Sequence, residues 1–201
     1  MKPLVYLAAF RQGGFTLETL VPDEPISVSD GAGRPRKWIS NYDGRFKGLI
    51  TVRQALAESR NAVAVWITGQ IGIDSVLRTS RSLGVRTPLG RYPTTALGAS
   101  ETNLLELANA YRAMASGIAA VPYVIKHVVR DSGEVVASTI TRPPPAAIGA
   151  AALSLTQEGL RGVVRLPTGT AHALASRGFP IAVIGKTGTT NDFKDAIFVG
   201  S

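Results

Sequence analysis

The sequence of 201 residues contains no cysteine and only two histidines, His127 and His172. Without thiols the chain forms no disulfide bond, performs no thiol catalysis and binds no metal through cysteine. Two histidines support neither a histidine-based catalytic triad nor a zinc site, so we interpret both as surface or packing residues. Any catalysis must therefore depend on other side chains.

Long hydrophobic runs are also absent. No segment approaches the roughly 18–20 consecutive apolar residues that cross a bilayer, and Met1-Lys2-Pro3 does not open a signal peptide. If the domain works outside the cytoplasm, we expect its export segment on another part of the polypeptide.

Acidic residues are too few to balance the basic ones, which gives a net charge of +8. Such a charge favours anionic partners in general, among them nucleic acid, anionic lipid and anionic wall polymers. The basic residues are scattered, however, apart from residues 34–37 and 45–47, and no pattern of stacking aromatic residues accompanies them. We therefore expect no binding to nucleic acid.

Apolar residues make up 45% of the chain and its mean hydropathy is +0.14, which indicates a packed globular protein. A chain of this length buries about 70% of its extended surface when it folds as one domain. We find no internal repeat and no shift in composition that marks a boundary. Residues 1–201 are therefore interpreted as a single domain.

Helical periodicity is the main secondary-structure signal. It predicts helices at residues 1–10, 51–72, 73–83, 101–116, 146–162 and 168–176. Thr51 and either Thr102 or Asn103 are expected to cap two of them. The polar triplet Ser59-Arg60-Asn61 indicates that the second is two helices joined by a short connection. The first helix has no capping residue before it, so we expect it to be cut within its first turn.

Strands are predicted by two hairpin signals. One is centred on Asp131-Ser132-Gly133 within residues 123–139, and the other joins the β-branched runs 181–184 and 196–199. Proline and glycine punctuate residues 12–48 so often that we predict a loop there. The fold class is thus predicted to be α/β, more narrowly α+β, with helices and antiparallel hairpins.

One stretch adds polar chemistry to a predicted strand. Gly185-Lys186-Thr187-Gly188-Thr189 follows the apolar run 181–184, so it is expected to present a lysine and two hydroxyls. The glycines on either side of the lysine and threonine let a ligand approach the backbone closely. This arrangement favours a site for an anionic group beside an acyl centre. The alternative is a strand edge with ordinary turn residues.

Three short motifs occur in an informative order, namely Lys2, then Ser59-Arg60-Asn61, then Lys186-Thr187-Gly188. In this order they resemble the transpeptidase domain of the bifunctional, class A penicillin-binding proteins. Longer segments are also similar to that family: KPLVYLAAF, NYDGRFKG, ALGASETNLLELANAYRAMASG and GKTGTTNDFKDAIFVG. The resemblance covers residues 2–201 and implies a β-lactamase/transpeptidase-like fold, in which helices pack on an antiparallel sheet.

Two departures from the family pattern carry expectations. The family's nucleophilic serine lies three residues before the lysine, which places it ahead of Met1. The family domain also has strands before that serine, and a strand and a helix beyond Ser201. We therefore expect a fragment with an incomplete sheet that is inactive alone. The resemblance further implies a membrane anchor and a glycosyltransferase domain on the missing N-terminal part, and a location in the periplasm or on the outer face of the cytoplasmic membrane.

The family reaction is acyl transfer, in which the serine attacks the D-Ala–D-Ala bond of a peptidoglycan stem peptide and β-lactam antibiotics intercept the first step. The resemblance implies that Lys2 activates that serine, with its pKa lowered by burial and by the nearby Lys186. Ser59 would relay a proton to the leaving nitrogen, and Asn61 would hold Lys2 and the substrate amide. No metal or organic cofactor is required.

Substrate binding is assigned by the same resemblance to the lysine-threonine-glycine strand. Lys186 and the hydroxyls of Thr187 and Thr189 would bind the substrate carboxylate, and Gly188 would leave room for the peptide to lie alongside. The backbone N–H of Thr189 would supply half of an oxyanion hole.

These roles lead to a geometric prediction. The ammonium of Lys2 should lie near the Ser59 hydroxyl and the Asn61 amide, with Lys186 across the same cleft. The side chain of Arg60 should point away from that cleft. Clustered lysines without a carboxylate between them are disfavoured in a purely structural core, so their convergence would itself indicate a site.

Two alternatives stay open at this point. A serine β-lactamase or a D,D-carboxypeptidase shares all three motifs, although the class A segments favour a transpeptidase and no deacylating glutamate can be assigned. The second alternative is a non-catalytic remnant that binds a partner or a wall glycan. The missing serine favours the remnant for this polypeptide, whereas the intact Lys186-Thr187-Gly188 favours an enzyme for its parent.

Overall fold

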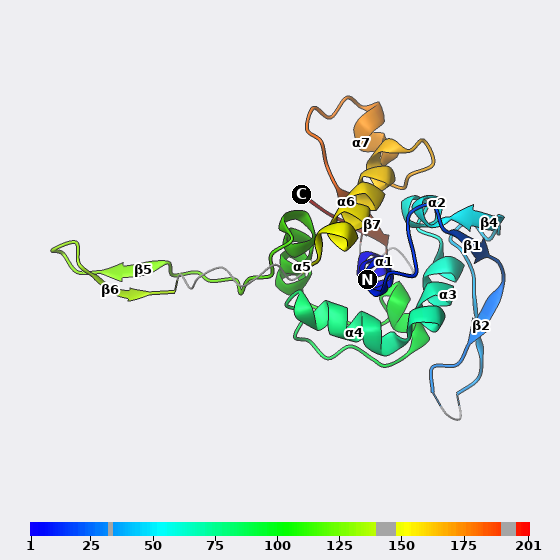
Figure 1. The fold of residues 1–201 in the computed structure, drawn as a ribbon, viewed down its shortest axis with the longest axis horizontal. Coiled ribbons are helices and arrows are strands. Elements are labelled where there is room, and N and C mark those ends of the chain that lie inside the picture. The colour runs from blue at the N-terminus through cyan, green and yellow to red at the C-terminus, as the bar shows by residue number, and fades with distance from the viewer. Residues whose placement is uncertain (32–33, 140–147, 190–195) are drawn as a thin grey trace.

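The structure is a computed structural model, and it describes residues 1–31, 34–139, 148–189 and 196–201. Figure 1 shows helices gathered around the N-terminal helix, with a hairpin that extends away from them. The helices are α1 (Lys2–Gln12), α2 (Val52–Ala57), α3 (Asn61–Ile71), α4 (Ile73–Ser82), α5 (Leu104–Ser116), α6 (Ala150–Arg165) and α7 (His172–Ser176), with a 3-10 helix η1 (Pro93–Leu97). Among the described residues, no helix combines the length and the apolar character needed to cross a bilayer.

Helix α1 is the centre of the hydrophobic core. Every residue from Pro3 to Phe10 is buried, so the helix is covered on all sides. Its contacts are with α2, α3, α4, α6 and η1, which come from parts of the chain far apart in sequence. Burial of α1 therefore fixes the direction in which Lys2, at its first turn, leaves the core.

The strands of the described residues form antiparallel pairs. They are β1 (Leu20–Asp23) with β4 (Gly48–Thr51), β2 (Ile26–Val28) with β3 (Lys37–Ile39), β5 (His127–Val129) with β6 (Val135–Ser138), and β7 (Gly185–Thr189) with β8 (Ala196–Gly200). Helices combined with antiparallel strands confirm the predicted α+β class, and the turn at Asp131-Ser132-Gly133 confirms the first hairpin.

The predicted loop over residues 12–48 is wrong, because three strands and the start of a fourth lie within it. Pro22 sits inside β1, opposite Leu49 of β4. A two-stranded ribbon leaves one side of each strand unpaired, so a residue without an N–H is tolerated there. Proline was therefore a misleading loop signal.

The strand predicted at residues 181–184 lies further along, at Gly185–Thr189. Ile184 continues the ladder only through paired backbone hydrogen bonds with Ser201, each of 2.9 Å. The register places Gly185 opposite Gly200 and against the ring of Phe198, which a Cβ on Gly185 would approach to 2.3 Å. Glycine at this position thus belongs to the strand and allows an aromatic ring to lie across it.

Local helix signals were mostly informative. Thr51 caps α2, accepting from the Gln54 N–H at 3.1 Å, and Asn103 rather than Thr102 caps α5. The predicted break between two helices is confirmed: α2 ends at Ala57 and α3 begins at Asn61, the last residue of the polar triplet. The helix predicted to end at Gly162 continues to Arg165 as α6, and it begins at Ala150, while residues 146–147 lie outside the described residues.

Residues 168–171 form a turn and not the start of a helix as predicted, so α7 begins only at His172. The Gly169 N–H donates to the Leu166 carbonyl at 2.8 Å, and the Ala171 N–H donates to the Val163 carbonyl at 3.0 Å. These bonds fold the turn back on the end of α6. A Cβ on Gly169 would lie 2.3 Å from the Val163 oxygen, so only glycine fits.

This crowding predicts that Gly169→Ala lowers the free energy of unfolding by about 1–3 kcal/mol, since the backbone must shift to admit a methyl group. Gly69→Ala is the matched control, because Gly69 is exposed on α3 with open space around its Cα. The control should raise stability by about 0.5–1 kcal/mol through helix propensity. Urea unfolding measures both variants, and equal stabilisation by the two would contradict the packing described here.

Candidate active site

A cleft of about 1040 Å³ opens at the N-terminal end of α1. Its walls come from the start of α1, the turn between α2 and α3, the turn at residues 168–170, and strands β7 and β8. The cleft contains all the site residues predicted from the sequence: Lys2, Ser59, Asn61, Lys186, Thr187, Gly188 and Thr189. Convergence of these segments was the main geometric prediction, and it is confirmed.

Lys2 and Ser59 make the direct contact that was predicted. The Lys2 Nζ donates to the Ser59 Oγ at 2.9 Å, across 57 positions of sequence. Ser59 has a φ of 60°, the only positive φ recorded for a described residue other than glycine. Such a backbone costs free energy in a residue with a Cβ and persists only where its surroundings enforce it.

Asn61 lies in the same cleft but with a different partner from the one expected. Its side-chain Nδ2 donates to the backbone oxygen of Ser40 at 2.8 Å. The expected contact with the Lys2 ammonium is not among the hydrogen bonds of the described residues. The Asn61 amide is therefore anchored to the segment before Asn41, at one edge of the cleft.

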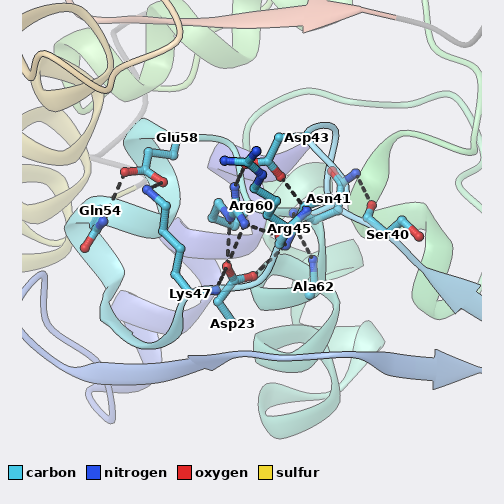
Figure 2. A network of polar contacts seen from close by, with 11 residues as sticks. Asp23, Ser40, Asn41, Asp43, Arg45, Lys47, Gln54, Glu58, Arg60 and Ala62 are labelled. Atoms are coloured by element: carbon cyan, nitrogen blue, oxygen red, sulfur yellow. Dashed lines mark hydrogen bonds and ion pairs between the residues drawn. The ribbon is translucent and has the colours of Figure 1, made fainter.

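Arg60 turns into a buried polar network, shown in Figure 2. Its guanidinium binds Asp23 through Nε and Nη2, at 2.9 and 2.8 Å, and Asp43 through Nη1 at 2.8 Å. It also donates to the carbonyl oxygen of Arg45. The hydrogen bond from Arg60 lowers the pKa of Asp43. Arg60 was predicted to point away from the cleft. Its partners are those of this network and not Lys2, although Arg60 itself is among the residues that line the cleft.

Asn41 connects the network to the start of α3. Its Oδ1 accepts from the backbone N–H groups of Asn61 and Ala62, at 2.7 and 3.2 Å, while its Nδ2 donates to Asp23 at 2.7 Å. Helix α3 has no cap from its own N-cap residue, Arg60. Asn41 thus performs the capping role from a distant segment. The network holds the residues before and after Ser59 in place.

The opposite wall is the strand that carries Lys186. Lys186 is only 4% exposed, and its Nζ donates to the carbonyl and hydroxyl oxygens of Thr187, at 3.2 and 3.3 Å, and to the hydroxyl of Thr170 at 3.4 Å. The strand is extended and pairs with β8, as predicted, with Lys186 opposite Val199.

The surroundings of the two cleft lysines lower the pKa of each. Burial lowers the pKa of Lys2 to about 8. Burial and, secondarily, repulsion by Lys2 lower the pKa of Lys186 to about 7. Among the described residues, neither lysine forms an ion pair with a carboxylate. A fraction of each is therefore neutral near pH 7, which lets the site accept a proton as well as bind an anion.

Sequence reasoning missed several polar residues that line the cleft, among them Glu58, Thr168 and Thr170. Thr170 accepts from the Thr187 hydroxyl at 2.6 Å, and Glu58 accepts from Lys47 at 2.7 Å and forms a side-chain hydrogen bond with Thr168. Thr168 and Thr170 were predicted to lie in a helix, where their hydroxyls would not indicate a role in the cleft. A threonine-glycine-threonine string between two helical patterns was the available signal.

Comparison with known proteins gives a consistent result. Residues 1–197 match the family model for the penicillin binding protein transpeptidase domain. The chain is 37% identical over 206 aligned positions to penicillin-binding protein 1A from Neisseria gonorrhoeae, an alignment that covers 99% of this chain and 25% of that protein. The chain thus spans about a quarter of the length of this curated relative.

Solved structures share the fold. Penicillin-binding protein 1A from Haemophilus influenzae has a TM-score of 0.85 at 25% identity, over 99% of this chain and 35% of that one. PonA1 from Mycobacterium tuberculosis, in complex with penicillin V, has a TM-score of 0.75 at 22% identity, over 99% of this chain and 55% of that one. These similarities agree with the predicted β-lactamase/transpeptidase-like architecture.

The polar network predicts that Arg60→Met lowers the free energy of unfolding by about 3–5 kcal/mol, because Asp23 would be left as an uncompensated buried charge. Arg53→Met is the matched control, since Arg53 pairs with Glu18 and Glu158 at the surface, where ion pairs contribute at most about 1 kcal/mol. Urea unfolding of both variants measures the difference, and a similar small loss in both would rule out a supporting role for Arg60.

The lowered lysine pKa values predict a pH dependence of stability. The ordinary pKa of lysine is about 10.4, so the unfolded chain binds more protons than the folded chain between about pH 7 and pH 10, and the free energy of unfolding rises with pH there. Lys186→Met should remove part of this slope and stabilise the protein at pH 7 by roughly 2–4 kcal/mol.

Urea unfolding at pH 7 and pH 9 measures this effect. Lys126→Met, on the exposed β5–β6 hairpin, is the control for loss of one positive charge. The prediction is contradicted if Lys186→Met lowers the free energy of unfolding at pH 7 and leaves its dependence on pH unchanged. Burial of Lys186 would then not destabilise the fold.

Proposed function

Because the chain belongs to the family of penicillin-binding protein transpeptidase domains, we propose that it forms the acyl-transfer site of a serine D,D-transpeptidase that cross-links peptidoglycan. The observation that supports this most directly is the 2.9 Å contact between Lys2 and Ser59 in a cleft whose opposite wall carries Lys186. Those residues belong to three separate motifs, and acyl transfer gives a reason for each of them to be there.

The reaction begins with a serine nucleophile. In the family pattern that serine lies one helical turn before Lys2, on the same face of the helix, and it precedes Met1 in this numbering. A serine hydroxyl needs an adjacent base at neutral pH. Lys2 serves as that base, because its pKa of about 8 lies near the operating pH, where proton transfer in both directions is efficient.

Proton transfer continues from Lys2 to the leaving group. The Ser59 hydroxyl, already hydrogen-bonded to Lys2, passes the proton to the nitrogen of the departing D-Ala. The strained backbone of Ser59 and the network around Arg60 hold that hydroxyl in place. Asn61 positions the substrate amide at the edge of the cleft. An amine from a second stem peptide then resolves the acyl-enzyme.

The strand β7 binds the substrate. Lys186 and the hydroxyls of Thr187 and Thr189 bind its terminal carboxylate, and the peptide lies alongside Gly188 as an added strand. The backbone N–H of Thr189 contributes to the oxyanion hole, an interaction worth roughly 3–4 kcal/mol in enzymes of this type. β-Lactam antibiotics, which carry a carboxylate beside a strained amide, occupy the same site; the PonA1 relative is solved with penicillin V.

From this activity we infer that the parent protein works on the outer face of the bacterial cytoplasmic membrane, because its stem-peptide substrates lie there. This chain spans 25% of the Neisseria relative, which leaves length in a parent of similar size for a membrane anchor and a glycosyltransferase domain. A β-lactamase or D,D-carboxypeptidase is a less favoured alternative, since the similarity runs over 99% of the chain to penicillin-binding protein 1A. A non-catalytic remnant is the other alternative.

Labelling with a fluorescent penicillin tests the proposal. The 201-residue chain should remain unlabelled, because it has no serine three residues before Lys2. A form extended by two residues, with serine in the first position, should be labelled covalently, and the matching alanine form should not. Lys2→Ala in the serine form should slow labelling by about 10²–10⁴-fold.

Two results would count against this assignment. Equal labelling of the alanine form would show that another residue is the nucleophile. A Lys2→Ala rate equal to that of the unsubstituted serine form would remove the role of Lys2 as the base.

A further inference from the structure

The turn formed by Thr168, Gly169 and Thr170, which we call the threonine bridge, touches both walls of the cleft. On the Ser59 side, the Thr170 N–H donates to the carbonyl of Ala57, the last residue of α2, at 3.1 Å. The Thr168 side chain bonds to Glu58, the residue directly before Ser59. The bridge is therefore attached to the chain on the N-terminal side of Ser59 through two bonds.

On the other wall the bridge contacts the strand β7. The Thr170 Oγ1 accepts from the Thr187 hydroxyl at 2.6 Å and from the Lys186 ammonium at 3.4 Å. Thr187 in turn accepts from Lys186 at 3.3 Å. Three polar groups from two segments thus form a closed set of hydrogen bonds, and Thr170 is the member that comes from outside the strand.

The bridge itself has little freedom to move. Backbone bonds of 2.8 and 3.0 Å fold it onto the end of α6, and Gly169 lies where any Cβ would meet a backbone oxygen. Helix α6 packs against both α1 and α2, the helices that carry Lys2 and lead to Ser59. The Thr170 hydroxyl is therefore a fixed reference point relative to the rest of the cleft.

We propose that Thr170 is a positioning residue for carboxylate binding: its hydroxyl orients Thr187 and Lys186 toward the ligand and sets their place relative to Ser59. This inference rests on the proposed function. A hydroxyl is suited to the role because it both donates and accepts. In the structure Thr187 donates to Thr170. When a carboxylate arrives, the Thr187 proton turns to it, and Thr170 donates its own proton to the vacated Thr187 oxygen.

This exchange gives a reason for a threonine at position 170 in place of an apolar residue of the same shape. Valine in its place would remove the donor that Thr170 offers to Thr187 as Thr187 binds the carboxylate, so that only Lys186 still donates to Thr187. It would also remove one of the acceptors of Lys186. Serine would preserve both. The pair Thr170→Val and Thr170→Ser therefore separates the hydroxyl from the packing of the side chain.

The experiment uses the serine-extended form and its acylation by benzylpenicillin, with the apparent dissociation constant and the acylation rate constant measured separately. Thr170→Val should raise the dissociation constant about 10-fold and change the rate constant less, while Thr170→Ser should stay within about 2-fold of the unsubstituted form. Thermal unfolding temperatures of the two variants should agree, which excludes a general loss of structure.

Benzylpenicillin methyl ester provides the readout that a merely structural role would not change. Its blocked carboxylate cannot use the Thr187 site, so Thr170→Val and the unsubstituted form should acylate with it equally. A Thr170→Val defect of the same size with acid and ester would overturn the proposal, as would a Thr170→Ser defect as large as that of Thr170→Val.

Failure of the proposed function is recognised separately, since the unsubstituted serine form would then not acylate at all. In that case reversible binding of N-acetyl-D-Ala-D-Ala to the 201-residue chain, measured by NMR titration, decides the inference. An affinity about 10-fold lower in Thr170→Val than in Thr170→Ser supports it. Equal affinities, or no binding by the unsubstituted chain, overturn it.

Discussion

The buried ion pair between Arg60 and Asp23 is the constraint on which the geometry of the cleft depends. Neither charge can be left alone in the core, so each must keep its partners. Arg60 lies between Ser59 and Asn61 in the sequence, and its guanidinium is held by Asp23. This contact therefore fixes the position of the turn that carries Ser59 and Asn61. The same carboxylate holds Asn41, which caps α3, so one network supports both the strained serine and the helix after it.

The two cleft lysines obey the opposite rule. Lys186 is buried and Lys2 is partly buried, and no carboxylate among the described residues pairs with either of them. A structural core would have neutralised them, so their arrangement is costly to folding and suits a site that must take up protons and anions. Helix α1, which is buried from Pro3 to Phe10 and packs on several other helices, contributes stability that offsets this cost.

Sequence signals predicted what is local and missed what is not. Thr51 capped its helix as expected, because the N–H that it accepts lies three residues away. The cleft residues came from the order of motifs that resembles a family, since no periodicity brings such distant positions together. Pro22 concealed an edge strand, whose free side makes proline harmless. Asn41 and Thr170 were missed because their partners lie 20 and 17 positions away, where local patterns carry no information.

The β5–β6 hairpin differs from everything described so far, because it extends away from the helices and every residue from 121 to 139 is exposed (Figure 1). It therefore contributes no side chain to the core, and a two-stranded hairpin without a packed face is marginally stable in water. Its opening and closing form a local equilibrium that is separate from unfolding of the helical body. The length and sequence of this segment can therefore change during evolution without lowering the stability of the fold around the cleft.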